Sequence, residues 1–127
     1  MKKITNKVSL FLGALLISSV CFAAHGDKQD IARQCDSMGS DLSRLAENAN
    51  ADSCAFEVKY AGWLLKGTSL LVRSERYQYG LDNLKQAKRQ LEKVVLAPEK
   101  CRYLSPLVKP HLAQLEPLIQ ELEWITH

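Results

Sequence analysis

The sequence predicts an all-α protein in which residues 25–127 form a single-domain, antiparallel up-and-down four-helix bundle. Four segments carry apolar residues at the three- and four-residue spacing of an amphipathic helix, and no segment alternates long enough to suggest a strand. The chain has 127 residues and is 46% hydrophobic, which suits one compact domain and excludes a disordered chain. The connections are short, and short connections favour antiparallel neighbours.

Residues 1–24 are predicted to be a secretory signal peptide. A basic segment, residues 1–7, is followed by 13 largely apolar residues, 8–20, and then by the small residues Ala23 and Ala24. A membrane-spanning helix needs about 20 apolar residues, so the segment is too short for an anchor. Cleavage after Ala23 or Ala24 would release a periplasmic or secreted protein without a transmembrane anchor, in a compartment where disulfides persist.

The first predicted helix begins at Asp27. Asp27 suits the N-cap position and Asp30 suits the first turn, where a carboxylate meets the positive end of the helix dipole. Asn48 to Asn50 close the segment. Its apolar stripe consists of Ile31, Cys35, Met38, Leu42, Leu45 and Ala49.

The second predicted helix runs from about residue 53 to residue 74 and is expected to be the most buried element, in contact with two neighbours. One stripe consists of Cys54, Val58, Ala61, Leu65, Thr68 and Val72. Further apolar residues widen it past half the circumference: Phe56, Tyr60, Trp63, Leu64, Leu70 and Leu71. Gly62 and Gly67 each cost about 1 kcal/mol relative to Ala inside a helix, which indicates that they permit close packing.

A turn is predicted over residues 73–80, followed by a third helix that Pro98 ends. The inward residues of this helix are Leu81, Leu84, Ala87, Leu91, Val94 and Val95. The fourth helix is expected to begin near Pro106 or Pro110, because proline is tolerated in a first helical turn, and to be kinked at Pro117. Its stripe consists of Val108, Leu112, Leu115, Ile119 and Leu122, with Leu118 and Ile125 alongside.

The centre of the chain resembles one tetratricopeptide (TPR) hairpin. The residues that carry the resemblance are Trp63-x3-Gly67 and Tyr77-x2-Gly80-x3-Leu84-x2-Ala87. The resemblance implies two antiparallel helices that nest through alternating large and small residues. No second copy occurs 34 residues away on either side, and a nested hairpin inside a bundle accounts for the same residues.

The bundle predicts a disulfide between Cys54 and Cys101. Helix directions place both residues at the same end, whereas Cys35 lies about 14 residues, or roughly 21 Å, before that end. A disulfide needs Cα atoms within about 7 Å of each other. Cys35 is therefore predicted to be a buried free thiol, with an intermolecular disulfide as the alternative.

No pattern in the sequence indicates catalysis, so the protein is not expected to be an enzyme or to carry a metal or cofactor. There is no paired Cys-x2-Cys, His-Glu-x2-His, Walker loop or Gly-x-Ser-x-Gly. Two ligand sites are conceivable alternatives: haem held between Met38 and His111, and copper held by His25 at a newly cleaved N-terminus. A carrier of haem, metal or an apolar molecule in the bundle is therefore the second functional hypothesis.

The charge balance disfavours a nucleic-acid-binding protein. The net charge of +3 comes from three lysines in the first 24 residues, and the rest of the chain is neutral overall. Locally, residues 25–57 carry −4, residues 58–109 carry +7 and residues 110–127 carry −3. We expect the basic third helix to be neutralised by acidic helices one and four, the alternative being a surface for an acidic partner or anionic lipid head groups.

The predicted function is a protein-binding module of the cell envelope: an adaptor, inhibitor, immunity protein or chaperone that is a monomer or weak dimer. Arg and Tyr are enriched among the residues that anchor interfaces. Arg73, Arg76, Tyr77 and Tyr79 cluster at one predicted turn and are the candidate partner-binding residues. Trp63 is expected in the core, and Trp124 in either the core or an interface.

Overall fold

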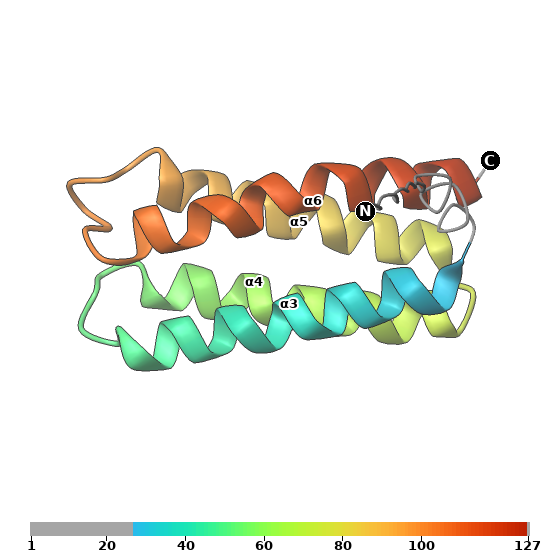
Figure 1. Cartoon of the computed structure of the whole chain (residues 1–127), viewed down its shortest axis with the longest axis horizontal. Coiled ribbons are helices and arrows are strands. Elements are labelled where there is room, and N and C mark those ends of the chain that lie inside the picture. Colours follow the sequence, from blue (N-terminus) through green and yellow to red (C-terminus); the bar gives the residue numbers. More distant parts are fainter. Residues whose placement is uncertain (1–26, 127) are drawn as a thin grey trace, which may run out of the picture.

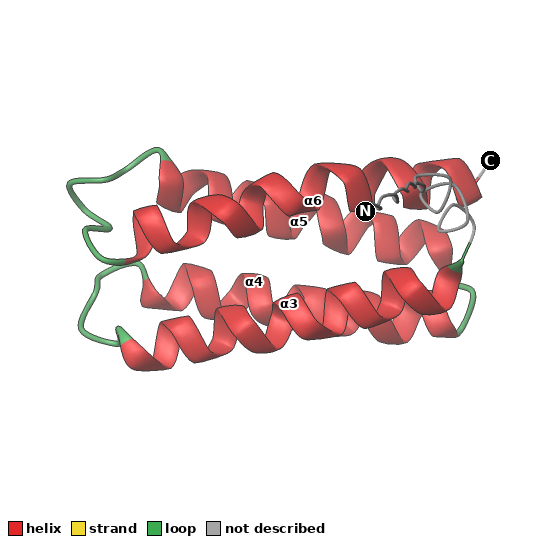
Figure 2. Ribbon diagram, in the orientation of Figure 1, coloured by secondary structure: helices red, strands yellow, loops and turns green. Residues whose placement is uncertain are grey.

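The computed structural model describes residues 27–126, which form four helices: α3 (Lys28–Asn48), α4 (Ala55–Arg73), α5 (Tyr77–Val95) and α6 (Leu104–Thr126). The helices alternate in direction and form two layers, α3 with α4 and α5 with α6 (Figure 1). No strand occurs in this part of the chain (Figure 2). The predicted all-α four-helix bundle is confirmed. The predicted signal peptide, 1–24, and His25 lie outside the described residues.

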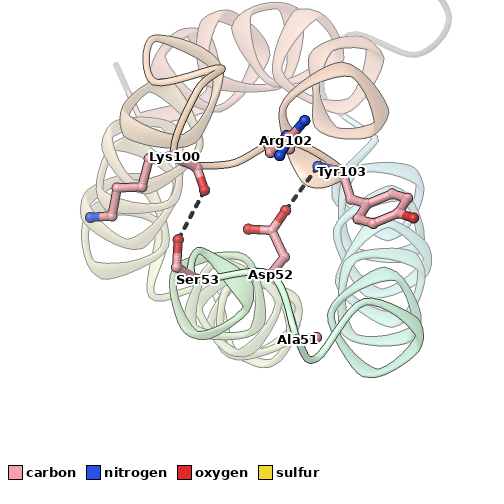
Figure 3. A pocket seen from close by; sticks show the side chains of 6 residues that line it. All are labelled: Ala51, Asp52, Ser53, Lys100, Arg102 and Tyr103. Atoms are coloured by element: carbon pink, nitrogen blue, oxygen red, sulfur yellow. Dashed lines mark hydrogen bonds between the residues drawn. The ribbon is translucent and has the colours of Figure 1, made fainter.

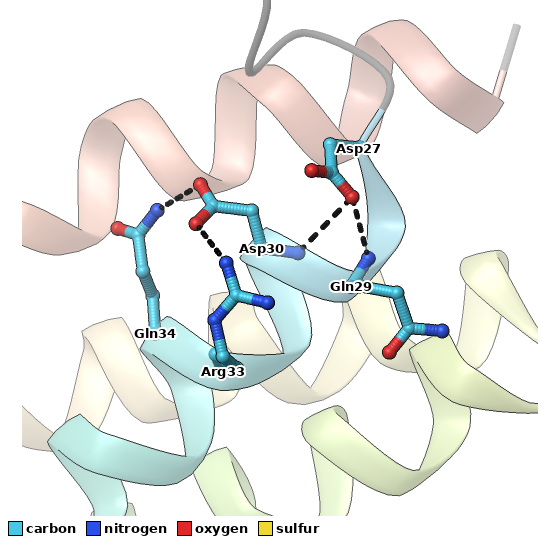
Figure 4. Close-up of polar contacts among 5 residues, drawn as sticks. All are labelled: Asp27, Gln29, Asp30, Arg33 and Gln34. Carbon is cyan, nitrogen blue, oxygen red and sulfur yellow. Dashed lines mark hydrogen bonds and ion pairs between the residues drawn. The ribbon is translucent and has the colours of Figure 1, made fainter.

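The start of α3 follows directly from its first residues. Asp27 is the N-cap, and its Oδ1 accepts hydrogen bonds from the backbone N–H groups of Gln29 (3.1 Å) and Asp30 (3.3 Å) (Figure 4). The Asp30 carboxylate in turn accepts from the side chains of Arg33 and Gln34. The predicted positions of both aspartates are confirmed, and Asp27 satisfies two backbone donors that would otherwise be unpaired at the helix end.

All four helices contribute to one core. Most residues of the predicted stripes are buried; Leu45, Ala49, Val95 and Leu112 are only partly covered. Burial of these side chains supplies the main stabilising free energy of such a bundle. The largest fully buried aliphatic side chains are Ile31, Leu42, Leu65, Leu84, Leu91, Leu104, Leu115 and Leu122.

Helices α3 and α4 touch backbone to backbone at two glycines. A Cβ atom added to Gly39 would lie 2.8 Å from the carbonyl oxygen of Gly62, and one added to Gly62 would lie 2.9 Å from that of Gly39. The close packing predicted for Gly62 is confirmed, and Gly39 is its counterpart on α3. Gly67 differs, because a Cβ there would meet only the Asn83 side-chain amide, at 3.1 Å.

These glycines give a matched pair of stability predictions. We expect Gly39→Ala to lower the free energy of unfolding by about 1–3 kcal/mol, because the methyl group meets backbone that cannot move without separating two helices. We expect Gly67→Ala to be neutral or to raise it by up to about 1 kcal/mol, because alanine favours the helix and the Asn83 amide can rotate away. Urea unfolding measures both; equal destabilisation by the two changes would contradict the glycine contact.

The turn between α4 and α5 is shorter than predicted, spanning only Ser74–Arg76 instead of residues 73–80. The N–H of Arg76 donates to Leu71 O (2.8 Å) and that of Glu75 to Val72 O (3.0 Å), while Glu75 has a φ of 63°. This is the Schellman pattern of a helix C-terminus, which usually has glycine in the left-handed position. Because glutamate holds that position here, the sequence gives no sign that the turn is tight, and α5 starts at Tyr77. Lys28 also pairs with Glu75 and lowers the pKa of its carboxyl group.

The ends of α5 and α6 follow the prolines. Helix α5 ends at Val95, three residues before Pro98, as predicted. Helix α6 begins at Leu104, so Pro106 lies in its first turn, whereas Pro110 and Pro117 lie within the helix and each removes one backbone donor. Within residues 27–126, none of the helices has the length and apolar content needed to cross a membrane.

Candidate functional site

Two connections meet at one end of the bundle, here called the disulfide end: residues 49–54 between α3 and α4, and residues 96–103 between α5 and α6. The structure joins Cys54 and Cys101 in a disulfide with Cα atoms 5.4 Å apart, so the predicted proximity is confirmed. Cys35 is fully buried and free. Burial, with a smaller contribution from the neighbouring Asp36, raises the pKa of the Cys35 thiol to about 12.

Asp52 links the same two connections by hydrogen bonds. Its Oδ1 accepts from the N–H of Cys54 (2.8 Å), and its Oδ2 accepts from the N–H groups of Tyr103 (2.9 Å) and Leu104 (3.1 Å) at the start of α6. Figure 3 shows the bond to Tyr103. Next to it, Ser53 Oγ donates to Lys100 O (2.9 Å). Asp52 therefore caps a helix that begins about 50 residues later in the chain, a contact that no local sequence pattern indicates.

A surface pocket at the disulfide end is lined by Ala51, Asp52, Ser53, Lys100, Arg102 and Tyr103. Asp52, Cys54 and Cys101 also bring three ligand-type atoms within 4.8 Å of one another. The two sulfurs are bonded to each other, and the carboxylate accepts three backbone hydrogen bonds. These groups therefore hold the two connections together, and the pocket between them is best explained as a by-product of that structural junction.

The predicted partner-binding residues lie at the opposite end, around the turn between α4 and α5. Arg73 ends α4, Arg76 is the N-cap residue of α5, and Tyr77 and Tyr79 lie in the first turn of α5. Arg73, Arg76 and Tyr79 are exposed, whereas Tyr77 is partly buried against the core. Three of the four candidates are therefore available to a partner.

Helix α4 has the smallest share of exposed residues among the four described helices and packs mainly against two neighbours, α3 and α5, as predicted. The core position predicted for Trp63 is wrong. Phe56 is 67% exposed, Trp63 54% and Leu70 66%, and Tyr60 is partly exposed. An apolar residue pattern alone does not show which apolar residues of a helix its neighbours cover.

The exposed apolar residues form one row along α4. Phe56, Tyr60, Trp63, Gly67 and Leu70, here called the outer α4 row, follow one another at steps of four, three, four and three residues. At about 100° per residue they lie opposite the buried stripe, and the row is about 21 Å long. The rings of Phe56 and Tyr60 are parallel, with centroids 6.1 Å apart, and Lys59 Nζ lies 5.7 Å from the Trp63 ring centroid. The row is thus an apolar and aromatic surface that is interrupted at Gly67.

Helix α5 provides a polar border to this row. The Asn83 side-chain amide donates to Leu64 O (3.4 Å) on α4, which fixes the edge of α5 that faces α4. Tyr79, Gln86 and Lys93 continue that edge at helical spacing from Asn83. The outer α4 row therefore has aromatic, amide and basic side chains along its α5 side.

Part of the positive charge is neutralised within the bundle. Helix α5 pairs with acidic α6, and α4 pairs with acidic α3, but α5 makes no contact with α3 in the described chain, contrary to expectation. The cross-helix pairs are Lys66–Asp36 (3.4 Å), Lys85–Glu123 (3.4 Å) and Lys88–Glu116 (2.7 Å). All these groups are substantially exposed, so the pairs contribute little stability.

The other basic side chains of the α4–α5 hairpin make no ion pair with any described residue. They lie beside the outer α4 row, at the turn, and on the outward side of α5: Lys59, Arg73, Arg76, Arg89 and Lys93. The hairpin therefore presents an apolar row together with positive charge that the bundle itself does not compensate.

The two residues of the conceivable haem site, Met38 and His111, occupy ordinary positions on their helices. Met38 is buried in the core stripe of α3, and His111 is half-buried on α6.

Comparison with protein-family models, with curated proteins and with solved structures finds no significant match to this chain. Helices α4 and α5 do form the hairpin on which the TPR resemblance is based, but Trp63 lies on the outer side of α4, away from the nested contact.

Sequence reasoning missed the outer α4 row although its signal is present. Two apolar patterns with the same spacing occur on α4, one containing Val58, Ala61 and Leu65 and one containing Phe56, Trp63 and Leu70. Their phases differ by about half a turn, which indicates two separate apolar faces. Merging them into one wide stripe produced the wrong expectation for Trp63.

Proposed function

We propose that this protein is an exported, protein-binding module of the cell envelope, acting as an adaptor, inhibitor, immunity protein or chaperone, and that it binds its partner through the outer α4 row. The observation that carries the proposal is the exposure of Phe56, Trp63 and Leu70 on one helix face. Contiguous exposed apolar patches on soluble proteins commonly mark interaction sites, and aromatic residues are enriched in interface cores.

The turn residues extend this surface. Arg73 lies one helical turn beyond Leu70, and Arg76 and Tyr79 follow it directly across the short turn. Arg and Tyr are among the residues that contribute most binding free energy when a partner covers them. The proposed interface therefore comprises the outer α4 row with Arg73, Arg76 and Tyr79, whereas Tyr77 supports the turn from within.

Capture of the partner from an envelope extract tests this proposal. We expect the triple variant Phe56→Ser, Trp63→Ser, Leu70→Ser to lose at least about 90% of the protein captured by the wild type, because hot-spot truncations cost about 2 kcal/mol or more each. The matched control is Leu96→Ser with Leu107→Ser, which removes exposed apolar groups at the disulfide end. Undiminished capture by the triple variant would contradict the proposed interface.

The carrier hypothesis makes a different prediction. A bundle that holds haem, a metal ion or an apolar molecule between its helices should retain that group when purified from the periplasm. We expect absorption spectra and metal analysis of the purified protein to show no stoichiometric group. A stoichiometric haem or metal would favour the carrier function over a purely protein-binding one.

A further inference from the structure

We infer that the partner segment which covers the outer α4 row is an acidic amphipathic α-helix about 14–18 residues long. This inference rests on the proposed function and adds the shape and charge of the ligand. It follows from the spacing of the row and from the charges along its edges.

The spacing of the row is that of a helix–helix seam. Alternating steps of four and three residues place Phe56, Tyr60, Trp63, Gly67 and Leu70 at successive core positions of a heptad pattern. A second helix covers such a row, and the length of about 21 Å corresponds to about 14 residues of helix. At Gly67, between Trp63 and Leu70, the seam has no side chain of its own; the Asn83 amide of α5 lies 3.1 Å from the position a Cβ would take, so a second helix meets a polar group there.

The charges beside the row specify an acidic partner. Lys59, Lys66 and Arg73 follow one another every seven residues, immediately before the core positions Tyr60 and Gly67 and the helix end at Ser74. This is the flanking position whose charges select the partner in paired helices. Only Lys66 has an ion-pair partner, the exposed Asp36, in the described chain. Lys93 adds positive charge on the α5 side, so carboxylates on both flanks of a bound helix would find partners.

Other occupants fit the same surface less well. A second copy would place two basic edges against each other, which costs binding free energy. Residues 1–24 of the chain contain three lysines and no acidic residue, so they do not complement the edges either. A membrane surface is contacted best by a broad apolar face, whereas this row is one residue wide and Glu57 lies beside it on α4.

Binding of designed peptides to the mature protein, secreted from the full chain with its disulfide intact, tests the inference. One 18-residue peptide has leucines at the heptad core positions and glutamates on both flanks, and the second has lysines in place of the glutamates. Fluorescence anisotropy of labelled peptides measures Kd. We expect the glutamate peptide to bind at least about tenfold more tightly than the lysine peptide, with a preference that weakens as salt is added.

Protein variants distinguish the contribution of the outer α4 row to peptide affinity from that of the basic residues beside it. Trp63→Ser with Leu70→Ser should weaken binding of the glutamate peptide at least about tenfold. Lys59→Gln with Arg73→Gln should weaken it severalfold and reduce its salt dependence, and Leu96→Ser with Leu107→Ser should leave it unchanged. Circular dichroism verifies that each variant is folded; none of these side chains belongs to the buried core.

Several results would overturn the inference. These are equal binding of the two peptides, binding only to phosphatidylglycerol vesicles, and a dimer in sedimentation analysis that the row variant abolishes. Failure of the acidic-helix inference can be distinguished from failure of the proposed function. If the row variant still loses the partner captured from the extract while the peptides do not discriminate, the interface stands and the acidic helix is wrong. If the row variant keeps the captured partner, the interface itself is wrong.

Discussion

Replacing both Cys54 and Cys101 by alanine should lower the free energy of unfolding by about 4 kcal/mol, the largest effect expected from any change described above. The disulfide closes a loop of 47 residues, and the chain-entropy relation assigns about 4 kcal/mol to a loop of that size. That is a large share of the roughly 5–15 kcal/mol that stabilises a whole domain. Urea unfolding of the oxidised wild type and of the double variant measures the difference.

Replacing Asp52 complements this experiment, because its carboxylate holds the same two connections by hydrogen bonds instead of a covalent bond. We expect Asp52→Ala to destabilise the oxidised protein by about 1–3 kcal/mol, since three backbone N–H groups lose their acceptor. The triple variant should deviate from additivity, because the disulfide and the carboxylate order the same residues. If the cysteine replacements cost less than about 1 kcal/mol, the hydrogen bonds alone hold this end and the disulfide does not constrain the unfolded chain.

Alkaline pH should destabilise the wild type more than Cys35→Ala. Burial raises the pKa of the thiol from its ordinary value of 9.0 to about 12 in the folded protein. A raised pKa in the folded state means that the stability contribution is complete below about pH 9 and is lost as pH rises toward 12, because only the unfolded chain then releases the proton easily. Between pH 8 and pH 10.5 the wild type should lose about 2 kcal/mol more than the variant.

Urea unfolding at the two pH values measures this difference, with recovery at pH 7 as the check that the disulfide has not exchanged with the thiol. The alanine variant is the control for lysine and tyrosine titration, which both proteins share. An identical pH dependence of the two proteins would show that Cys35 reaches solvent in the folded state. That outcome would revive the alternative of an intermolecular disulfide, which full burial of Cys35 disfavours.

Local sequence patterns account for most of the fold. The helical stripes, the Asp27 cap and the Pro98 stop depend on residues close in sequence, and all three are found as predicted. The Cys54–Cys101 pairing follows once the helices alternate, because direction alone decides which ends meet. The predictions fail where the outcome depends on tertiary contact or on an unusual backbone. Asp52 caps a helix about 50 residues away, and Glu75 holds a conformation normally given to glycine.

The candidate site was predicted less well than the fold. Two neighbours were expected for α4 and are found, but the apolar pattern does not show which of its apolar residues those neighbours cover. For that reason Trp63 was expected in the core although it lies on the outer face. The turn residues Arg73, Arg76 and Tyr79 were chosen from residue type alone. Their exposure and their position next to Leu70 give them a place in the same proposed surface.

Photo-crosslinking in the producing cell is the most direct test of whether the outer α4 row binds the partner. A photoreactive phenylalanine analogue is placed at Trp63 in the outer α4 row or, as the control, at Leu96, an 80% exposed residue at the disulfide end. We expect one discrete crosslinked species from position 63 and no crosslinked species from position 96. The species from position 63 should disappear when Phe56 and Leu70 are changed to serine. Crosslinks from position 96 but not from position 63 would contradict the proposal that the outer face of α4 binds the partner.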